Sequence, residues 1–281
     1  MAEGHGDLPL SVPCGQCMGC RLERSRQWAI RCMHEGQMHE ENCFITLTYD
    51  EENLPDNGQL VLSDLQKFWK RLRKKGHSFR YFACGEYGPS TERPHYHALV
   101  FGYRPQDETI LSEGSHTLFE SEELEKTWGL GLCSFGNLTF ETASYVAGYV
   151  TKKITGPMAD DHYLRVNRET GEIYHLKPPF NTMSRRPAIG TTWMQEYGQD
   201  TYKKDQVIMR GRAMKPPKAY DEMLKKSDPD LWIKTRIKRN SEQAKMRPEN
   251  QDPDEHYYSS FNHYKARDKI ARQRSNERDK I

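Results

Sequence analysis

The spacing of apolar and polar residues predicts four strands in this chain. Residues 42–50 (NCFITLTYD) are rich in β-branched and aromatic side chains, which favour strands. Residues 79–88 (FRYFACGEYG) and 95–102 (HYHALVFG) have the same character, and the proline-containing segment 89–94 that joins them predicts a strand pair. Residues 131–140 (GLCSFGNLTF) are the fourth candidate.

Helical spacing of apolar residues predicts the other elements. Helices are expected within residues 14–40, 63–76 and 119–128, from about Thr142 to a stop at Gly156 and Pro157, and, with low hydrophobicity, beyond residue 193. Residues 160–192 are rich in loop signals, and we expect the last 40 residues to be disordered when free.

The order strand, helix, strand, strand, helix predicts the fold class. It is typical of an α+β fold in which helices flank a central antiparallel sheet, with a ferredoxin-like, split βαβ core. We expect three parts: a cysteine cluster and first helix (1–40), the α+β core (41–200), and a basic, mostly helical or partly disordered C-terminal extension (201–281).

Composition narrows the setting of the protein. Hydrophobic residues make up 35% and charged residues 29% of 281 residues, which indicates one core with substantial irregular or tail sequence. The N-terminus does not have the pattern of a signal peptide, and no run of about 18 apolar residues predicts a membrane span. Seven cysteines, an odd number, favour a reducing cytoplasm over a secreted disulfide framework.

Charge is distributed unevenly along the chain. Residues 1–202 carry 21 basic and 27 acidic side chains, a net charge of −6, whereas residues 203–281 carry 21 basic and 13 acidic ones, a net charge of +8. A basic C-terminal segment suggests a polyanionic partner, although such an excess is also typical of a solvated helix face.

Two histidines in the segment ERPHYHALVFG suggest a metal site. In a strand, side chains i and i+2 point to the same face, so His95 and His97 can chelate one divalent ion. Glu86 on the neighbouring strand is the expected third ligand, and Glu92 in the connecting loop is the alternative. An isolated His-x-His pair is more often an ordinary surface or core pair.

Two tyrosines and a lysine suggest what such a metal would serve. Tyr145 and Tyr149 lie four residues apart, so on a helix they share one face with Lys152. Alone, the pair would be read as core packing. Beside a metal, a phenol can attack a phosphodiester: forming phenolate at pH 7 costs about 4 kcal/mol, which a metal and a lysine can offset. The product would be a 5′-phosphotyrosine and a free 3′-OH, and rejoining would need no ATP.

These motifs resemble a known family. PHYHALVFG, with FITLTY upstream and YVAGYVTKK downstream, is similar to the three motifs of the HUH endonucleases that initiate rolling-circle replication. PCGQCMGCR, GEYG, MSRRPAIG and MKPPKAYDEML resemble the replication initiation proteins of the Microviridae, in the gokushovirus branch of single-stranded DNA phages. The similarity covers nearly the whole chain.

The resemblance implies metal-dependent, origin-specific nicking and rejoining of single-stranded DNA, which leaves a 3′-OH primer. It implies that His95, His97 and Glu86 bind the metal, that Tyr145 and Tyr149 are nucleophiles that alternate, and that Lys152 is the motif lysine. The residues expected to lie near DNA are Thr46, Thr48, Lys153, Arg185 and Arg186. For the arginines, ordinary surface placement carries equal weight.

The cofactors and partners follow from the same reasoning. The metal is expected to be Mg²⁺ or Mn²⁺, and a site with two imidazoles suits Mn²⁺ somewhat better. The partner is the viral DNA origin, single-stranded or as a supercoiled duplex, in the cytoplasm of a bacterial host. Because the chain has no Walker-type motif, a host helicase and a host polymerase are expected to assist. No membrane partner is expected.

A cysteine cluster suggests a second metal site. Cys14, Cys17 and Cys20 have the spacing C-x2-C-x2-C, which suits Zn²⁺. The fourth ligand would be Cys32, His34 or Cys43; the alternative is a set of reduced, loosely packed thiols.

Two other functions remain open. One is an HUH relaxase or transposase of a mobile element, which shares the chemistry. The other is a non-enzymatic, zinc-containing DNA-binding protein, which would bind DNA without nicking it and would tolerate loss of His97.

Overall fold

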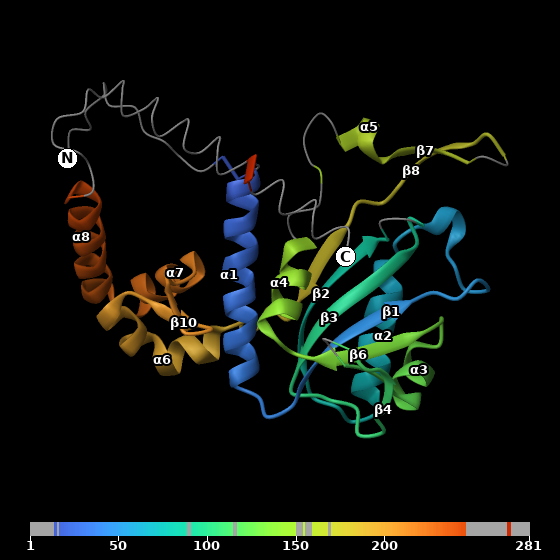
Figure 1. Cartoon of the computed structure of the whole chain (residues 1–281), viewed down its shortest axis with the longest axis horizontal. Coiled ribbons are helices and arrows are strands. Elements are labelled where there is room, and N and C mark those ends of the chain that lie inside the picture. Colours follow the sequence, from blue (N-terminus) through green and yellow to red (C-terminus); the bar gives the residue numbers. More distant parts are fainter. Residues whose placement is uncertain are drawn as a thin grey trace.

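A single antiparallel sheet forms the centre of the molecule (Figure 1). The computed structural model describes residues 14–15, 17–88, 91–114, 117–149, 154, 159–167, 170–245 and 269–270. The seven strands of the sheet lie in the order β4-β5-β6-β1-β3-β2-β9. They are β1 (Asn42–Thr48), β2 (Arg80–Tyr87), β3 (Pro94–Phe101), β4 (Thr109–Ser112), β5 (Leu118–Glu120), β6 (Cys133–Asn137) and β9 (Phe180–Met183).

Helices cover both faces of the sheet, and smaller elements surround it. The helices packed on the sheet are α1 (Met18–Gln37), α2 (Leu62–Lys74), α3 (Glu122–Trp128) and α4 (Phe140–Tyr149). A 3-10 turn (Asp56–Gly58), α5 (Ala159–Tyr163) and a hairpin of β7 (Leu164–Val166) and β8 (Ile173–His175) lie near one end of the central strands. The C-terminal elements are α6 (Thr191–Lys204), β10 (Val207–Met209), β11 (Arg212–Met214), α7 (Lys218–Ser227) and α8 (Pro229–Lys245).

The predicted α+β fold is confirmed. Taken in chain order, β1, β2, β3 and β6 are the first to fourth core strands, and they lie in the spatial order 4-1-3-2. Helix α2 joins the first two of these strands and α3 joins the last two. This arrangement is the split βαβ topology. The sequence analysis missed β4 and β5, and it also missed β9, which lies in the region taken as loop-rich.

Strand alternation divides the core into two layers. Tyr96 of β3 points to the face covered by α2 and α3, where it packs near Trp69 and Trp128. Leu99 of the same strand points to the opposite face, which α1 and α4 cover through residues such as Val146. His95 and His97 are odd-numbered like Leu99, so they lie on the α4 side of the sheet.

The C-terminal helices are fixed to α1 rather than to the sheet (Figure 1). Trp193 of α6 stacks on His34 of α1 with 3.4 Å between ring centroids, and the Tyr220 hydroxyl lies 3.0 Å from His34 Nδ1. Glu35, which is buried, accepts a hydrogen bond of 2.6 Å from the Gly190 backbone N–H. Helix α1 is therefore shared by the sheet and the C-terminal elements.

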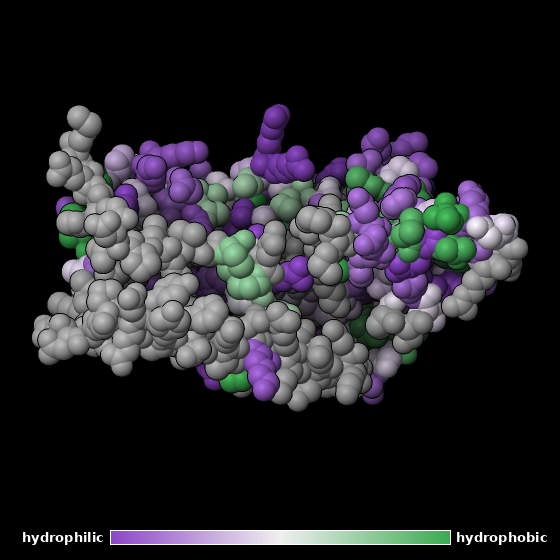
Figure 2. Space-filling view, turned by 90° about the horizontal axis from the view of Figure 1, so that it is seen from above, coloured by the Kyte–Doolittle hydropathy of each residue, from purple (hydrophilic) through white to green (hydrophobic). Residues whose placement is uncertain are grey.

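The surface carries some exposed apolar side chains. Figure 2 shows hydrophobic residues gathered at the end of the molecule where the β7–β8 hairpin lies, and Leu164, Val166 and Ile173 of that hairpin are exposed. Within the described part of the chain, no helix is both long and apolar enough to cross a bilayer.

Candidate active site

Two neighbouring strands bring a carboxylate and two imidazoles together. In the antiparallel pairing of β2 with β3, Glu86 lies opposite His95. Glu86 Oε1 is 2.9 Å from His95 Nε2 and 3.1 Å from His97 Nε2, and the ligand atoms of the three residues lie within 4.8 Å of one another. Glu92 instead pairs with Arg165 at 3.1 Å, so Glu86 is the carboxylate at this cluster.

Hydrogen bonds to the other ring nitrogens orient both imidazoles. His95 Nδ1 lies 3.0 Å from the Arg93 carbonyl oxygen, and His97 Nδ1 lies 3.0 Å from Thr46 Oγ1. An Nδ1–H that donates to oxygen leaves a lone pair on Nε2, which is the form that binds a metal. Both Nε2 atoms face Glu86, so they are the atoms available to a shared ion.

The charge of Glu86 suits a cation. Burial alone would raise the pKa of this carboxyl, but hydrogen bonds from His95, His97 and Tyr149 outweigh it and lower the pKa to about 2. Glu86 is therefore anionic at neutral pH. Two imidazole nitrogens and one carboxylate form a donor set that fits Mn²⁺, and also Mg²⁺ with water completing the shell.

Helix α4 presents both tyrosines to this cluster. The Tyr145 hydroxyl is 3.4 Å from His97 Nε2 and 3.5 Å from Glu86 Oε1. The rings of Tyr145 and Tyr149 are perpendicular, with 4.9 Å between centroids. Tyr145 is 47% exposed and Tyr149 only 5%. Of the two phenols, Tyr145 is thus the one that an external substrate can reach.

The surroundings make both phenols weak acids. Burial, together with the Glu86 charge, raises the pKa of Tyr145 to about 12, although a hydrogen bond from Tyr149 acts in the opposite direction. Burial and the same carboxylate raise the pKa of Tyr149 well above its usual range. Attack by either oxygen therefore requires a positive charge that offsets Glu86.

Sequence reasoning missed one residue of this site. Phe44 of β1 stacks on His97 with 5.5 Å between ring centroids and contacts Tyr145 edge-on at 6.3 Å. It lies two residues before Thr46, so the period-2 alternation of strands could have placed it on this face.

The other predicted site residues are distributed elsewhere. Lys152 and Lys153 lie outside the described residues. The Thr48 hydroxyl donates to the Leu132 carbonyl oxygen at 3.2 Å. Arg185 and Arg186 are exposed in the turns that follow β9, apart from the metal cluster.

The cysteine cluster forms, but without the fourth ligand that the sequence suggested. The sulfur atoms of Cys14, Cys17 and Cys20 lie within 4.8 Å of one another. Cys32 is buried between α1 and the sheet, the Cys43 thiol donates to the Tyr103 carbonyl oxygen, and His34 lies under Trp193. The expectation that one of these three completes the site is wrong, because each is fixed in a different part of the core.

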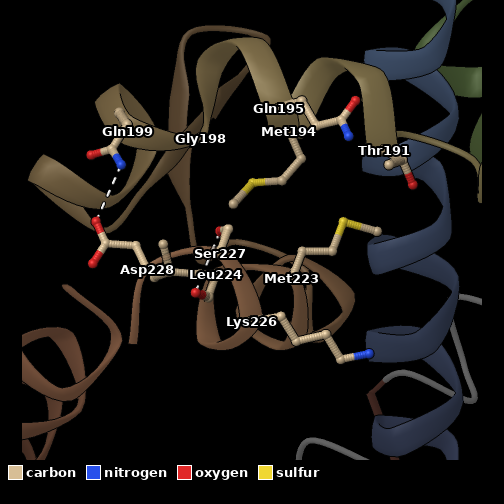
Figure 3. Close-up of a pocket in the computed structure, with 10 residues that line it drawn as sticks. All are labelled: Thr191, Met194, Gln195, Gly198, Gln199, Met223, Leu224, Lys226, Ser227 and Asp228. Atoms are coloured by element: carbon tan, nitrogen blue, oxygen red, sulfur yellow. Dashed lines mark hydrogen bonds between the residues drawn. The ribbon is translucent and has the colours of Figure 1, made fainter. Parts of the chain in front are cut away.

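A groove lies away from this cluster, on the opposite side of α1 from the sheet (Figures 1 and 3). It has a volume of about 550 Å³ between α6 and α7. Met194 and Met223 point into it, and Gln199 donates to Asp228 at its edge, with 3.2 Å between Nε2 and Oδ2. Its lining includes none of the residues of the metal cluster or of the tyrosine pair.

Comparison with known proteins assigns a family. The sequence profile of the replication-associated proteins of the ORF2 type matches residues 42–154, from the start of β1 to just beyond α4. The "Replication-associated protein VP4" of Bdellovibrio phage phiMH2K is 33% identical over 271 residues, covering 91% of this chain and 81% of that protein. The chain belongs to the family of phage replication-associated proteins.

Further relatives of this replication-associated protein have the same description. The "Replication-associated protein ORF2" of Spiroplasma virus 4 is 32% identical over 84% of this chain and 75% of its own length. The "Replication-associated protein ORF4" of Chlamydia phage 1 is 29% identical over 76% of this chain and 54% of its own length. No solved structure matches the chain significantly.

Proposed function

We propose that this replication-associated protein is a rolling-circle initiator that nicks and rejoins one strand of viral DNA at an origin. The observation that carries the proposal is the position of the Tyr145 hydroxyl, 3.4 Å from His97 Nε2 and 3.5 Å from Glu86 Oε1. A nucleophile beside a cluster of potential metal ligands is the arrangement that metal-assisted phosphoryl transfer requires. Membership in a phage replication family supports DNA as the substrate.

Each residue of the site has a role in this mechanism. Glu86, His95 and His97 would hold one Mg²⁺ or Mn²⁺ ion, which when bound withdraws charge from the scissile phosphate and orients it. Tyr145 Oη attacks the phosphorus atom, the bond to the 3′ oxygen breaks, and that oxygen takes up a proton while the phenol loses its own. The products are a 5′-phosphotyrosine and a 3′-OH, which can prime synthesis by a host polymerase. Attack by a 3′-OH on the phosphotyrosine reverses these bond changes and rejoins the strand.

Tyr145 is proposed as the first nucleophile. It is far more exposed than Tyr149, and its pKa is raised less. With a pKa of about 12, forming the phenolate at pH 7.5 costs about 6 kcal/mol. Positive charge is needed to reduce this cost, and Lys152 is proposed to contribute to it. Tyr149 is proposed to act in the second transfer of each round.

A covalent-adduct assay tests the proposal. Labelled single-stranded DNA that tiles the phage genome is incubated with the full-length protein and Mn²⁺, and adducts are resolved on denaturing gels. We expect an adduct that EDTA prevents. Tyr145→Phe should decrease the initial rate of adduct formation at least about 10³-fold, whereas Tyr149→Phe should change it less than about threefold. Tyr197→Phe, at an exposed tyrosine of α6, is the control.

Other outcomes would point to other functions. An adduct that survives in the Tyr145→Phe, Tyr149→Phe double variant would contradict the tyrosine assignment, and nicking that resists EDTA would contradict the metal assignment. DNA binding without nicking, unchanged in His97→Ala, would favour a non-enzymatic DNA-binding protein. Cleavage restricted to mobile-element ends would favour a relaxase or transposase. The proposed setting is the bacterial host cytoplasm, with a host helicase as an additional partner.

A further inference from the structure

Three thiols converge where helix α1 begins. Cys17 precedes the first helical residue, Cys20 lies in the first turn, and the sulfurs of Cys14, Cys17 and Cys20 lie within 4.8 Å of one another. The segment that carries Cys14 is folded back onto the helix, because the Arg24 side chain contacts the Gly15 carbonyl oxygen at 3.5 Å.

Backbone N–H groups support the sulfurs in the manner of a metal knuckle. The Cys17 N–H donates to Cys14 Sγ at 3.2 Å, and the Cys20 N–H donates to the Cys17 sulfur. The same contact therefore repeats at both C-x2-C steps. Such N–H···S bonds stabilise negative charge on sulfur, which a thiol does not carry and a metal-bound thiolate does.

The cluster is nevertheless unfavourable without a cation. The Cys20 N–H lowers the pKa of Cys17, but partial burial and the two neighbouring thiols outweigh it, so the pKa is raised. Three sulfurs this close together would repel one another as thiolates. A bound dication removes that repulsion.

The distances favour one small, soft ion. With Zn–S bonds of about 2.3 Å and tetrahedral angles, the sulfurs bound to one Zn²⁺ lie about 3.8 Å apart. Separations within 4.8 Å need contract by only about 1 Å to reach that geometry. An iron–sulfur cluster is larger and would hold its thiolates further apart. Hard cations such as Mg²⁺ prefer oxygen ligands.

We propose that Cys14, Cys17 and Cys20 bind one Zn²⁺ through three thiolates, with a ligand other than sulfur in the fourth position. The four other cysteines of the chain, Cys32, Cys43, Cys84 and Cys133, are buried elsewhere. Binding releases three thiol protons, so the zinc–thiolate centre carries a net charge of −1. The N-terminus of α1 and the Arg24 guanidinium are well placed to stabilise that charge.

Zinc at this position would fix the start of the helix against which α4 packs. The Ser25 hydroxyl, one turn beyond the cluster, donates to the Ser144 carbonyl oxygen at 3.5 Å, next to Tyr145. The zinc site thus has a structural role, and it stands whether or not the protein nicks DNA.

Cobalt substitution tests the proposal. Reduced, metal-free full-length protein is titrated with Co²⁺, and the near-ultraviolet charge-transfer band of cobalt thiolates is recorded. We expect the band to saturate at one equivalent with the intensity of three thiolates, and Zn²⁺ to displace it. Cys14→Ser and Cys17→Ser should each decrease it severalfold, and circular dichroism checks that both variants fold.

The Glu86→Gln, His97→Ala double variant is the matched control, because it alters the other metal cluster. It should keep the full thiolate band. Absence of the band in the wild-type protein would overturn the proposal, as would an unchanged band in folded Cys17→Ser. An intensity typical of four thiolates would contradict the fourth ligand, and stoichiometric iron in protein purified without oxygen would contradict zinc.

Discussion

Thr46 tests how the candidate metal cluster is held together. Its hydroxyl lies 3.0 Å from His97 Nδ1, and it comes from β1, where Thr46 pairs directly with His97. Valine has nearly the same shape but no hydroxyl. In Thr46→Val the imidazole of His97 would lose the acceptor that fixes its tautomer and aims Nε2 at Glu86.

The expected magnitude can be worked out in two ways. Loss of an outer partner of a ligating histidine typically lowers metal affinity about 10- to 100-fold, which is about 1.4–2.7 kcal/mol. Leaving a buried donor without its acceptor costs about 1–3 kcal/mol, and His97 is only 6% exposed. The two ranges agree, so we expect the Kd for Mn²⁺ to rise by one to two orders of magnitude.

Calorimetric titration with Mn²⁺ measures this change, because Mn²⁺ has little affinity for the cysteine cluster. Thr46→Ser retains the hydroxyl and should bind within about threefold of the wild type. Thr48→Val is the matched control: Thr48 faces the same side of β1 and pairs with His95, but its hydroxyl donates to Leu132. If Thr46→Val bound Mn²⁺ as tightly as the wild type, the positioning role would be refuted. If the wild type bound none, the metal site itself would fail.

Two further predictions concern the interface of α1 with the C-terminal elements. Burial lowers the pKa of His34 to about 3, so the unfolded chain, which protonates near pH 6.5, binds the proton more readily. Stability should be complete above pH 6.5 and should fall toward pH 3 by at most about 5 kcal/mol; urea unfolding at several pH values should show a flatter profile for His34→Gln, and an identical profile would contradict the idea. Glu35→Gln should lower the free energy of unfolding at pH 7 by about 2–3 kcal/mol, because Glu35 bonds Gly190 and pairs with Arg80. Burial opposes this, but these partners and His39 lower the pKa of Glu35, so its stabilising effect should disappear as the pH falls below about 4, where wild type and variant should converge; a difference that persists there would count against the charge.

Much of the candidate site could be predicted because it depends on local periodicity. Strand alternation is enough to place His95 and His97 on one face, and helical spacing is enough to align Tyr145 with Tyr149. The choice of Glu86 over Glu92 needed the register of the β2–β3 pair, in which Glu86 lies opposite His95. Register depends on the loop between the strands, and that loop has no sequence signal strong enough to fix it.

What could not be predicted depends on contacts between distant segments. Strand β9 consists of four half-buried residues, and it forms by pairing with β2, where Asn181 lies opposite Cys84. His34 and Glu35 occupy positions that a solvated helix face would tolerate, yet both are buried by segments more than 150 residues further along the chain. Periodicity describes one element at a time, so it does not report which element will cover a polar face.

Glu86 has two opposite effects on the proposed reaction. Burial already raises the pKa of Tyr145, and the carboxylate, 3.5 Å from its hydroxyl, raises it further, so Glu86 alone opposes formation of the nucleophile. The same carboxylate is the anionic member of the donor set, and without it two neutral imidazoles would hold a dication weakly. Glu86→Gln should therefore make Tyr145 easier to ionise and still abolish nicking. This opposition keeps the phenol protonated until a cation occupies the cluster, because the charge that raises its pKa is the charge that the cation neutralises.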